Sequence, residues 1–272
     1  MIKLGRYLVA LAVTVTALGQ GSKTTEPPPS RQILTSDGVN LYVTVRGQGT
    51  SCLYIHGGQG SGSYWMEKFS GAMLERHFQM IYLDKRGSCR SSSPRNKDYS
   101  MDRIVRDFEE VRAALGITHW ITLGHSFAGL LQMGYAQRHP EIIKGMIMLN
   151  CTLDLRGNSQ ESIPKACELL GIADRGAFLD ESTPLPERIS KLYGELRKKN
   201  LWLKMGYASF ENFQLMNETF KEIPAFNHEF ERIRLPEEYL TNFKPATDGL
   251  RMPVLYYYVK TDWMVAPIAP RV

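Results

Sequence analysis

The residues best suited to chemistry lie in the stretch Gly124-His125-Ser126-Phe127-Ala128-Gly129, between an apolar run and a helical pattern. A sharp strand-to-helix turn needs small residues around its apex, because the flanking backbones approach closely. The hydroxyl of Ser126 would then stand above a sheet edge, and the backbone N–H of Phe127 would face whatever that hydroxyl attacks. The pattern therefore predicts a nucleophilic serine. An ordinary glycine-bearing turn is the alternative.

A second glycine-rich segment, His56-Gly57-Gly58-Gln59-Gly60, follows an apolar run at 52–55. Glycines at the end of a strand let backbone N–H groups face a cavity without obstruction by side chains. The N–H groups of Gly58 and Phe127 are therefore the predicted donors to an oxyanion, with Gln59 as the alternative to Gly58. No Gly-Lys-Ser/Thr sequence follows, so the segment does not predict a phosphate loop. A plain glycine-rich turn is again the alternative.

The segments around these residues alternate between strand and helix patterns. Residues 32–34 and 41–45 predict a hairpin that turns at Gly38. Buried strands are predicted at 52–55, 78–83, 120–123 and 143–149, and helices at 101–115 and 130–138. This order is typical of an α/β fold, in which helices cover both faces of a parallel sheet.

The alternation stops near Asp154. Helical patterns such as 187–199 and 202–219 follow without a buried strand, and they predict an inserted helical cap. A strand pattern returns at 252–259. We therefore predict an α/β core at 31–154, a helical cap at 155–245 and a resumed core at 246–272.

Composition narrows the classes of function. With 272 residues, of which 43% are hydrophobic and 22% charged, the chain is neither disordered, collagen-like nor a coiled coil. Its net charge of +5 is mild and spread along the chain, so we do not expect nucleic acid as a partner. The four cysteines match no zinc or CxxC spacing and are predicted to be free, packed thiols. A disulfide is the alternative, with no pair favoured. No metal or cofactor is implied.

The first thirty residues have the features of an export signal. Lys3 and Arg6 precede an apolar stretch at 7–18, and small residues border a cleavage position after Gly19. We predict a signal peptide at 1–19, a linker at 20–30 and an exported protein, periplasmic or secreted. An uncleaved membrane anchor is the alternative, and no other membrane contact is expected.

Three blocks of this sequence resemble the α/β-hydrolase fold and, within it, the proline iminopeptidase branch: HGGQG at 56–60, DKRGSCRSS at 84–92 and GHSFAG at 124–129. The resemblance covers residues 32–150 and resumes at 252–265. It departs from the family at Gln59, Lys85, Cys89 and Ala128, where the family has Pro, Gln, Gly and Gly.

The resemblance implies a serine hydrolase whose partner is a small peptide or acyl substrate. The activity that it implies is an aminopeptidase that releases proline or a similar small residue from the N-terminus of peptides. An esterase or other small-acyl hydrolase is the alternative among enzymes, because a fold does not determine a substrate. An exported binding protein with an inactive pocket is the alternative outside enzymes.

The resemblance also assigns the remaining site residues. Asp262, just after the last predicted strand, is implied as the acid of a catalytic triad, with Asp154 in reserve and a solvated loop carboxylate as the alternative. Glu211 and Glu218 are implied to bind the free amine of the substrate; solvated carboxylates on a helix are the alternative. Asp84 and Arg86 are expected to form a structural pair.

A hydrolase of this kind needs a histidine base, which in this fold follows the acid along the chain. The six histidines are 56, 77, 119, 125, 139 and 228, and of these only His228, in the cap, is placed to approach Ser126 from above. We therefore expect a chain that lacks its last strand and helix, exposes apolar surface at one sheet edge and hydrolyses slowly. A non-catalytic descendant, or a histidine supplied by a partner chain, is the alternative.

Overall fold

The computed structural model describes residues 30–180, 182–207, 209–260 and 262–264. The predicted signal peptide at 1–19 and nearly all of the predicted linker lie outside these ranges. Within them, no helix is both long enough and apolar enough to cross a lipid bilayer.

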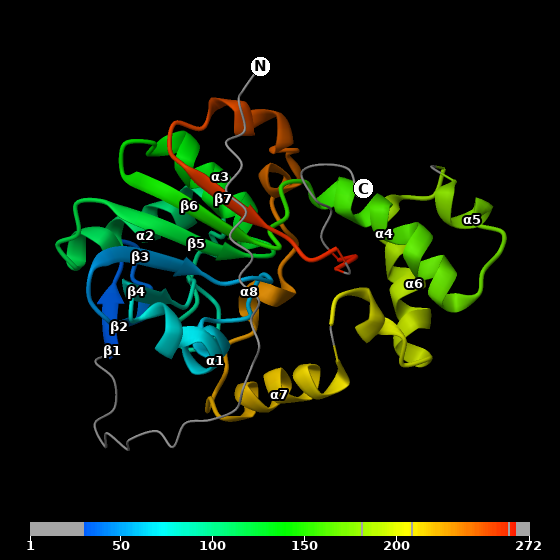
Figure 1. Ribbon diagram of the computed structural model, residues 1–272, viewed down its shortest axis with the longest axis horizontal. Helices are drawn as coiled ribbons and strands as arrows, with labels where there is room; N and C mark the ends of the chain where they lie inside the picture. The colour runs from blue at the N-terminus through cyan, green and yellow to red at the C-terminus, as the bar shows by residue number, and fades with distance from the viewer. Residues whose placement is uncertain (1–29, 181, 208, 261, 265–272) are drawn as a thin grey trace.

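The described residues form one seven-stranded sheet in the order β1-β2-β4-β3-β5-β6-β7 (Figure 1). The strands are β1 Ser30–Leu34, β2 Asn40–Arg46, β3 Thr50–Ile55, β4 Phe78–Leu83, β5 Trp120–His125, β6 Ile143–Leu149 and β7 Val254–Tyr257. The hairpin β1–β2 is antiparallel, as predicted, and every pair from β4 to β7 is parallel. The carboxyl ends of the parallel strands share one edge, which brings the loops after β3, β4 and β5 together.

Helices cover both faces of this sheet, because its strands alternate their apolar side chains between two cores. On one face, α2 (Met101–Ala114) and α3 (Ala128–Arg138) pack on residues such as Ile55 and Leu83. On the other face, α1 (Tyr64–Leu74) packs on Tyr54 and Tyr82. The sequence predicted α2 and α3 but made no prediction for α1. The α/β fold that it predicted is confirmed.

The face that α1 covers is open toward the edge strand β7. Ile147 and Leu149 of β6 are half-buried there, and the neighbouring Leu255 and Tyr257 of β7 are 61% and 58% exposed. The expectation of exposed apolar surface at one sheet edge is therefore confirmed.

The segment from Leu155 to Gly249 contains helices joined by loops and no strand in its described part. Its elements are α4 Leu155–Leu170, α5 Gly176–Leu179, α6 Leu185–Lys198, η1 Trp202–Met205, α7 Phe210–Lys221, α8 Glu229–Arg232, η2 Glu237–Leu240 and η3 Lys244–Gly249. Figure 1 shows α4, α5 and α6 as a lobe beside the sheet, with α7 below it. This lobe has its own core, in which Ile163 and Cys167 of α4 meet Leu192 and Leu196 of α6.

The single helix predicted over 202–219 is wrong. The chain forms the short η1, leaves helical geometry at Gly206, and starts α7 afresh at Ser209. The hydroxyl of Ser209 accepts a hydrogen bond of 3.1 Å from the N–H of Asn212, as an N-cap does. The apolar spacing continued across this break, which is why the pattern alone did not locate it.

The four cysteines are free and buried, as expected. Cys52 lies within β3, Cys151 follows β6, and Cys167 belongs to the core of the lobe. They therefore act as small apolar side chains.

Candidate active site

Ser126 forms the apex of a sharp turn between β5 and α3. Its φ of +56° lies in the left-handed region, which costs a serine conformational energy. Hydrogen bonds hold the strained backbone: its N–H donates to the oxygen of Leu149 at 3.2 Å, and its carbonyl accepts from Gly129 at 3.1 Å and Thr152 at 2.9 Å. The hydroxyl of Ser126 makes no hydrogen bond within the described residues. The predicted strand–turn–helix arrangement is confirmed.

Gly124 and Gly129, on either side of Ser126, lie too close to neighbouring atoms for a larger residue. A Cβ atom at Gly129 would lie 2.4 Å from the carbonyl oxygen of Thr152. One at Gly124 would lie 2.1 Å from Oε1 of Gln132 and 3.2 Å from the Cβ of Ala128. Larger residues at these positions would push α3 away from the strand, so the turn depends on them.

The loop after β3 lies directly against this turn. A Cβ atom at Gly57 would be 2.7 Å from Nδ1 of His125, 2.9 Å from its carbonyl oxygen and 3.1 Å from the Cβ of Ser126. The backbone N–H groups of Gly58 and Phe127 have no acceptor within the described residues. Gly58 itself has a φ of +54°. Two backbone N–H groups without a described acceptor therefore belong to the segments that meet at the serine, one following Gly57 and one following Ser126.

Lys85 holds the loop after β3 from the buried side. Its Nζ donates to the carbonyl oxygens of His56 at 2.9 Å and Gly58 at 3.3 Å, and it lies 5.3 Å from the ring centroid of Phe127. Burial lowers the pKa of Lys85 to about 7, against the opposing effect of Asp84. The sequence marked Lys85 only as a departure from the family and did not predict this contact.

His56 is a buried structural ring. Its Nε2 accepts from the backbone N–H of Lys85 at 3.1 Å, and its Nδ1 lies 3.0 Å from the oxygen of Gly57. Burial, together with the charge of Lys85, lowers the pKa of His56 to about 3. The ring is therefore neutral at physiological pH.

The expected pairing of Asp84 with Arg86 is wrong. Asp84 accepts from Nε of Arg90 at 2.6 Å and from the N–H of Ser63 at 2.7 Å, on the α1 side of the sheet. Arg86 donates from Nε to Asp107 of α2 at 2.6 Å, on the opposite side. Both side chains are buried, and each is neutralised by a partner on its own side, so the two do not meet.

Asp262 follows β7 at the same sheet edge as the serine. Its Oδ2 accepts from Nδ2 of Asn150 at 3.0 Å, and its Oδ1 accepts from the N–H of Met264 at 2.9 Å. The reserve candidate, Asp154, instead caps α4 by accepting from the N–H of Gly157 at 2.9 Å. Asp262 thus lies in a loop at the sheet edge where Ser126 lies, whereas Asp154 caps α4.

Glu211 and Glu218 both lie on α7 and are exposed. Glu218 forms an ion pair of 2.6 Å with Lys221 one turn away. At these positions both carboxylates face solvent.

None of the six histidines hydrogen-bonds the hydroxyl of Ser126 in the described structure. His125 packs on the ring of Trp65, with centroids 5.3 Å apart, and burial lowers its pKa to about 4. His228 pairs with Glu231 at 3.0 Å. The remaining three are His77 and His119, which directly precede β4 and β5 at the far edge of the sheet, and His139, which ends α3.

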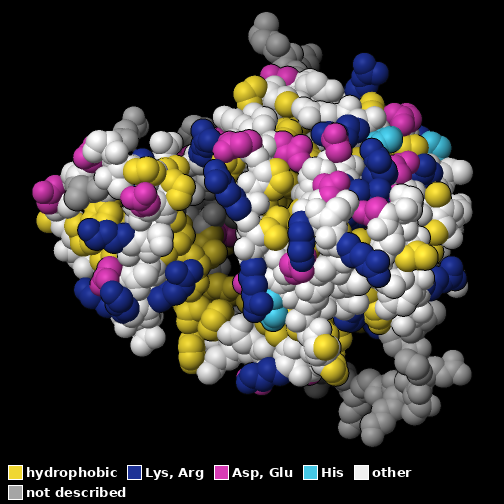
Figure 2. All heavy atoms as spheres, turned by 180° about the vertical axis from the view of Figure 1, so that it is seen from behind, with side chains coloured by type: hydrophobic (Ala, Val, Ile, Leu, Met, Phe, Trp, Pro, Cys, Tyr) yellow, Lys and Arg dark blue, Asp and Glu magenta, His cyan; other side chains and the backbone are white. Residues whose placement is uncertain are grey.

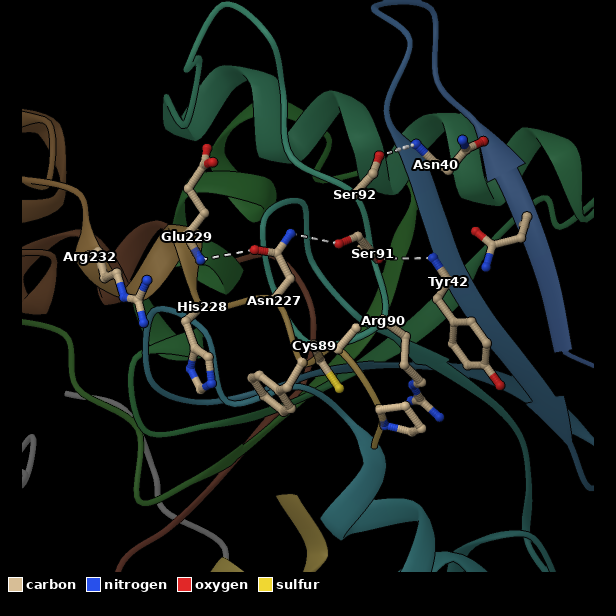
Figure 3. Close-up of a pocket in the computed structure, with 14 residues that line it drawn as sticks. Asn40, Tyr42, Cys89, Arg90, Ser91, Ser92, Asn227, His228, Glu229 and Arg232 are labelled. Carbon is tan, nitrogen blue, oxygen red and sulfur yellow. Dashed lines mark hydrogen bonds between the residues drawn. The ribbon is translucent and has the colours of Figure 1, made fainter. Parts of the chain in front are cut away.

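Two large cavities lie between the loops of the body and the helical segment. The first, of about 920 Å³, lies beside the loop after β4 (Figure 3). There Nδ2 of Asn227 donates to the oxygen of Ser91 at 2.9 Å, while its Oδ1 accepts from the N–H of Glu229 at 3.0 Å. The second, of about 1020 Å³, lies between α4, α6 and residues 233–240, and Gln59 of the loop after β3 lies on its wall.

Comparison with known proteins agrees with this geometry. Residues 53–272 match the family described as alpha/beta hydrolase fold. The chain belongs to this family. A putative carbamate hydrolase, RutD of Escherichia coli O157:H7, is 26% identical over 212 residues, which are 73% of each protein.

Solved structures share the fold at lower identity. A proline iminopeptidase-related protein from Thermus thermophilus superposes with a TM-score of 0.65 at 19% identity, over 88% of this chain and 83% of that one. The esterase RhEst1 from Rhodococcus sp. ECU1013 gives a TM-score of 0.57 at 20% identity, over 84% and 80%. As a member of the alpha/beta hydrolase family, the chain is a hydrolase by relationship.

Proposed function

We propose that this alpha/beta hydrolase cleaves small acyl substrates, esters or amides, with Ser126 as the nucleophile. The strained, left-handed backbone of Ser126 beside the unbonded N–H groups of Gly58 and Phe127 carries this proposal. Maintaining a serine in that conformation costs free energy, and such strain is concentrated at functional sites. The printed names of the relatives, which include a carbamate hydrolase and an esterase, support the same class of reaction.

In the proposed reaction, Oγ of Ser126 attacks the carbonyl carbon and forms an acyl-serine, while the bond to the leaving group breaks and that group takes up the hydroxyl proton through solvent and departs as an alcohol or amine. Water then hydrolyses the acyl-serine, which releases the acid and restores the hydroxyl of Ser126. The N–H groups of Gly58 and Phe127 stabilise the negative charge that develops on the carbonyl oxygen, and the N-terminus of α3 adds to the field. Asp262 has the role of orienting an imidazole. Because no histidine of the described structure reaches Ser126, we expect the hydroxyl to be weakly activated and turnover by the chain to be slow.

Within this class, we propose a peptide substrate with a free N-terminal proline or similar small residue. The blocks HGGQG, DKRG and GHSFAG support this choice, with Glu211 and Glu218 as candidate partners of the amine. Ester hydrolysis is the second candidate. The exposed positions of both glutamates favour it, because a solvated carboxylate adds little to the binding of an amine.

The test is covalent labelling of the full chain with a fluorophosphonate, with and without added imidazole, beside the variant Ser126→Ala. We expect slow labelling that imidazole accelerates and that S126A abolishes. Labelling that survives in S126A, or no labelling at all with imidazole, would contradict the proposal and favour a non-catalytic binding protein.

The substrate class is tested with a proline arylamide, its N-acylated form and a simple acyl ester. Activity that depends on the free amine favours the peptidase. Equal or greater activity on the ester favours the second candidate. Glu211→Gln should weaken binding of the free-amine substrate only if the peptidase is correct.

We also propose that the protein is exported. Lys3, Arg6 and the apolar stretch at 7–18 support this. N-terminal sequencing of the protein recovered from its source should begin near Gln20. Recovery of uncleaved protein with the membranes would favour the anchor instead.

A further inference from the structure

The cavity between α4, α6 and residues 233–240 has a wall that no role described above explains. Its volume is about 1020 Å³, large enough for a ligand of drug size. Seen from behind, hydrophobic side chains gather in the hollow between the lobe and the body (Figure 2). Gln59, next to the proposed oxyanion donor Gly58, lies on the wall of the cavity, and its Nε2 lies 3.4 Å from the carbonyl oxygen of Ile233.

Most of the wall is apolar. The side chains that give it this character are Leu155, Leu185, Pro186, Ile189, Ile233, Leu235 and Leu240. A wall of this kind favours a ligand with an apolar body, because apolar surface leaves water when the two meet.

Arg188 of α6 gives the same wall a buried positive charge. Its side chain is 6% exposed, and its one hydrogen bond joins Nη1 to the carbonyl oxygen of Phe178 at 2.9 Å. Its Nε is buried and has no hydrogen-bond partner among the residues that the structure describes. A buried guanidinium group ordinarily pairs with a carboxylate, so one that has no such pair at a cavity wall favours an anionic ligand.

Within the described residues, no carboxylate forms a hydrogen bond or ion pair with Arg188. Hydrogen bonds from Ser182 lower the pKa of Asp180, and Arg188 adds to this effect, but the carboxylate of Asp180 bonds to Ser182 rather than to Arg188. Glu237 lies 3.4 Å from Arg156 across the wall. The wall thus carries three arginines, at 156, 188 and 234, and one glutamate.

We propose that this cavity binds an organic anion with an apolar body, and that Arg188 binds its anionic group. A carboxylate suits the guanidinium best, since two parallel N–H donors match its two oxygens. A phosphate ester shares the same chemistry. A role for this anion as part of a substrate of Ser126 would rest on the proposed function. Binding of the anion by Arg188 does not require Ser126.

The test is calorimetric titration of the full chain with octanoate, octyl phosphate and the neutral octanamide at low ionic strength. We expect octanoate to bind about 10- to 100-fold more tightly than octanamide, which is the effect of one charge-assisted hydrogen-bonded pair. The preferred anion identifies the head group. Arg188→Gln should remove the preference and leave octanamide binding unchanged.

Lys198→Gln is the matched control, because Lys198 is an exposed cation on the same helix that pairs with Glu195 outside the cavity. It should keep the preference. If R188Q does not fold, two other variants test the proposal. Arg188→Lys retains the charge and should keep part of the preference for octanoate. Ile189→Glu places a negative charge at the cavity wall and should weaken the binding of octanoate more than that of octanamide. Equal binding of octanoate and octanamide by the unaltered chain would overturn the proposal, as would no binding up to the solubility limit.

The variant Ser126→Ala separates this proposal from the proposed function. It should bind octanoate as the unaltered chain does. If S126A loses labelling but still prefers octanoate, the anion site is supported independently of the proposed function. If the unaltered chain is labelled but has no preference for an anion, the anion site is refuted and the proposed hydrolase is not.

Discussion

At the scale of single residues, the buried charge of Lys85 helps to hold the loop after β3 in place beside Phe127. A buried ammonium group bonds the carbonyl oxygens of His56 and Gly58 and lies beside the ring of Phe127. It therefore contacts both sides of the proposed oxyanion site from behind. No carboxylate forms an ion pair with it in the described structure, so its charge remains costly.

This cost predicts how stability depends on pH. The pKa of Lys85 falls from 10.5 to about 7 on folding, so between these values the unfolded chain binds more protons. The free energy of unfolding should therefore rise from about pH 7 toward pH 10 because of this group. Urea unfolding of the unaltered chain and of Lys85→Gln at several pH values measures the difference.

Comparison with K85Q isolates the effect of Lys85, because the contributions of the other titrating groups to the free energy of unfolding are the same in both proteins. The stability of the unaltered chain should increase relative to K85Q as the pH rises. Parallel curves would show that Lys85 keeps an ordinary pKa.

At the scale of elements, the site depends on contact between the loop after β3 and the turn after β5. These segments lie far apart in sequence, yet the parallel pairing of β3 with β5 places them side by side. The contact at Gly57 is tighter than any side chain allows. A glycine is therefore needed at position 57 because the turn at Ser126 packs against it, and not because of the conformation of its own loop.

Gly57→Ala should accordingly separate the loop from Ser126. We expect a loss of stability of roughly 1–3 kcal/mol, as for other overpacked sites, and a large fall in fluorophosphonate labelling. Thermal unfolding and the rate of labelling provide the measurements.

Gly194→Ala is the control, because a Cβ atom at Gly194 meets nothing within 4 Å and the position is helical. It should leave labelling unchanged and stability equal or slightly higher. Normal labelling in G57A would mean that the loop is not part of the site.

At the scale of the whole molecule, the sheet is unevenly covered. Helices pack on both faces near its centre, but the edge strand β7 exposes Leu255 and Tyr257 beside half-buried Ile147 and Leu149. Exposed edge strands with apolar side chains tend to pair with other chains.

We therefore expect the protein to self-associate as its concentration rises. Leu255→Lys should weaken the association about tenfold or more, because burying a leucine contributes roughly 1.5–3 kcal/mol. Leu34→Lys, in β1 at the opposite edge, should have a smaller effect, because Leu34 is the one large apolar side chain that β1 exposes, whereas β7 exposes Val254, Leu255 and Tyr257. Sedimentation at several concentrations measures this; a monomer throughout, or equal effects of both variants, would refute the expectation.

Features that depend on neighbours along the chain could be predicted from the sequence. The turn at Ser126, the glycine-rich loop and the positions of the core strands along the chain follow from local spacing and small residues, so they were predictable. The same is true of the α/β class and of the position of the helical segment.

Features that depend on partners distant in sequence became known from the folded structure. It paired Asp84 with Arg90 and Arg86 with Asp107, ended η1 before α7, and left Arg188 buried without a carboxylate. The reason is physical: the energy of a buried charge depends on what surrounds it in space, and local spacing contains no information about those surroundings.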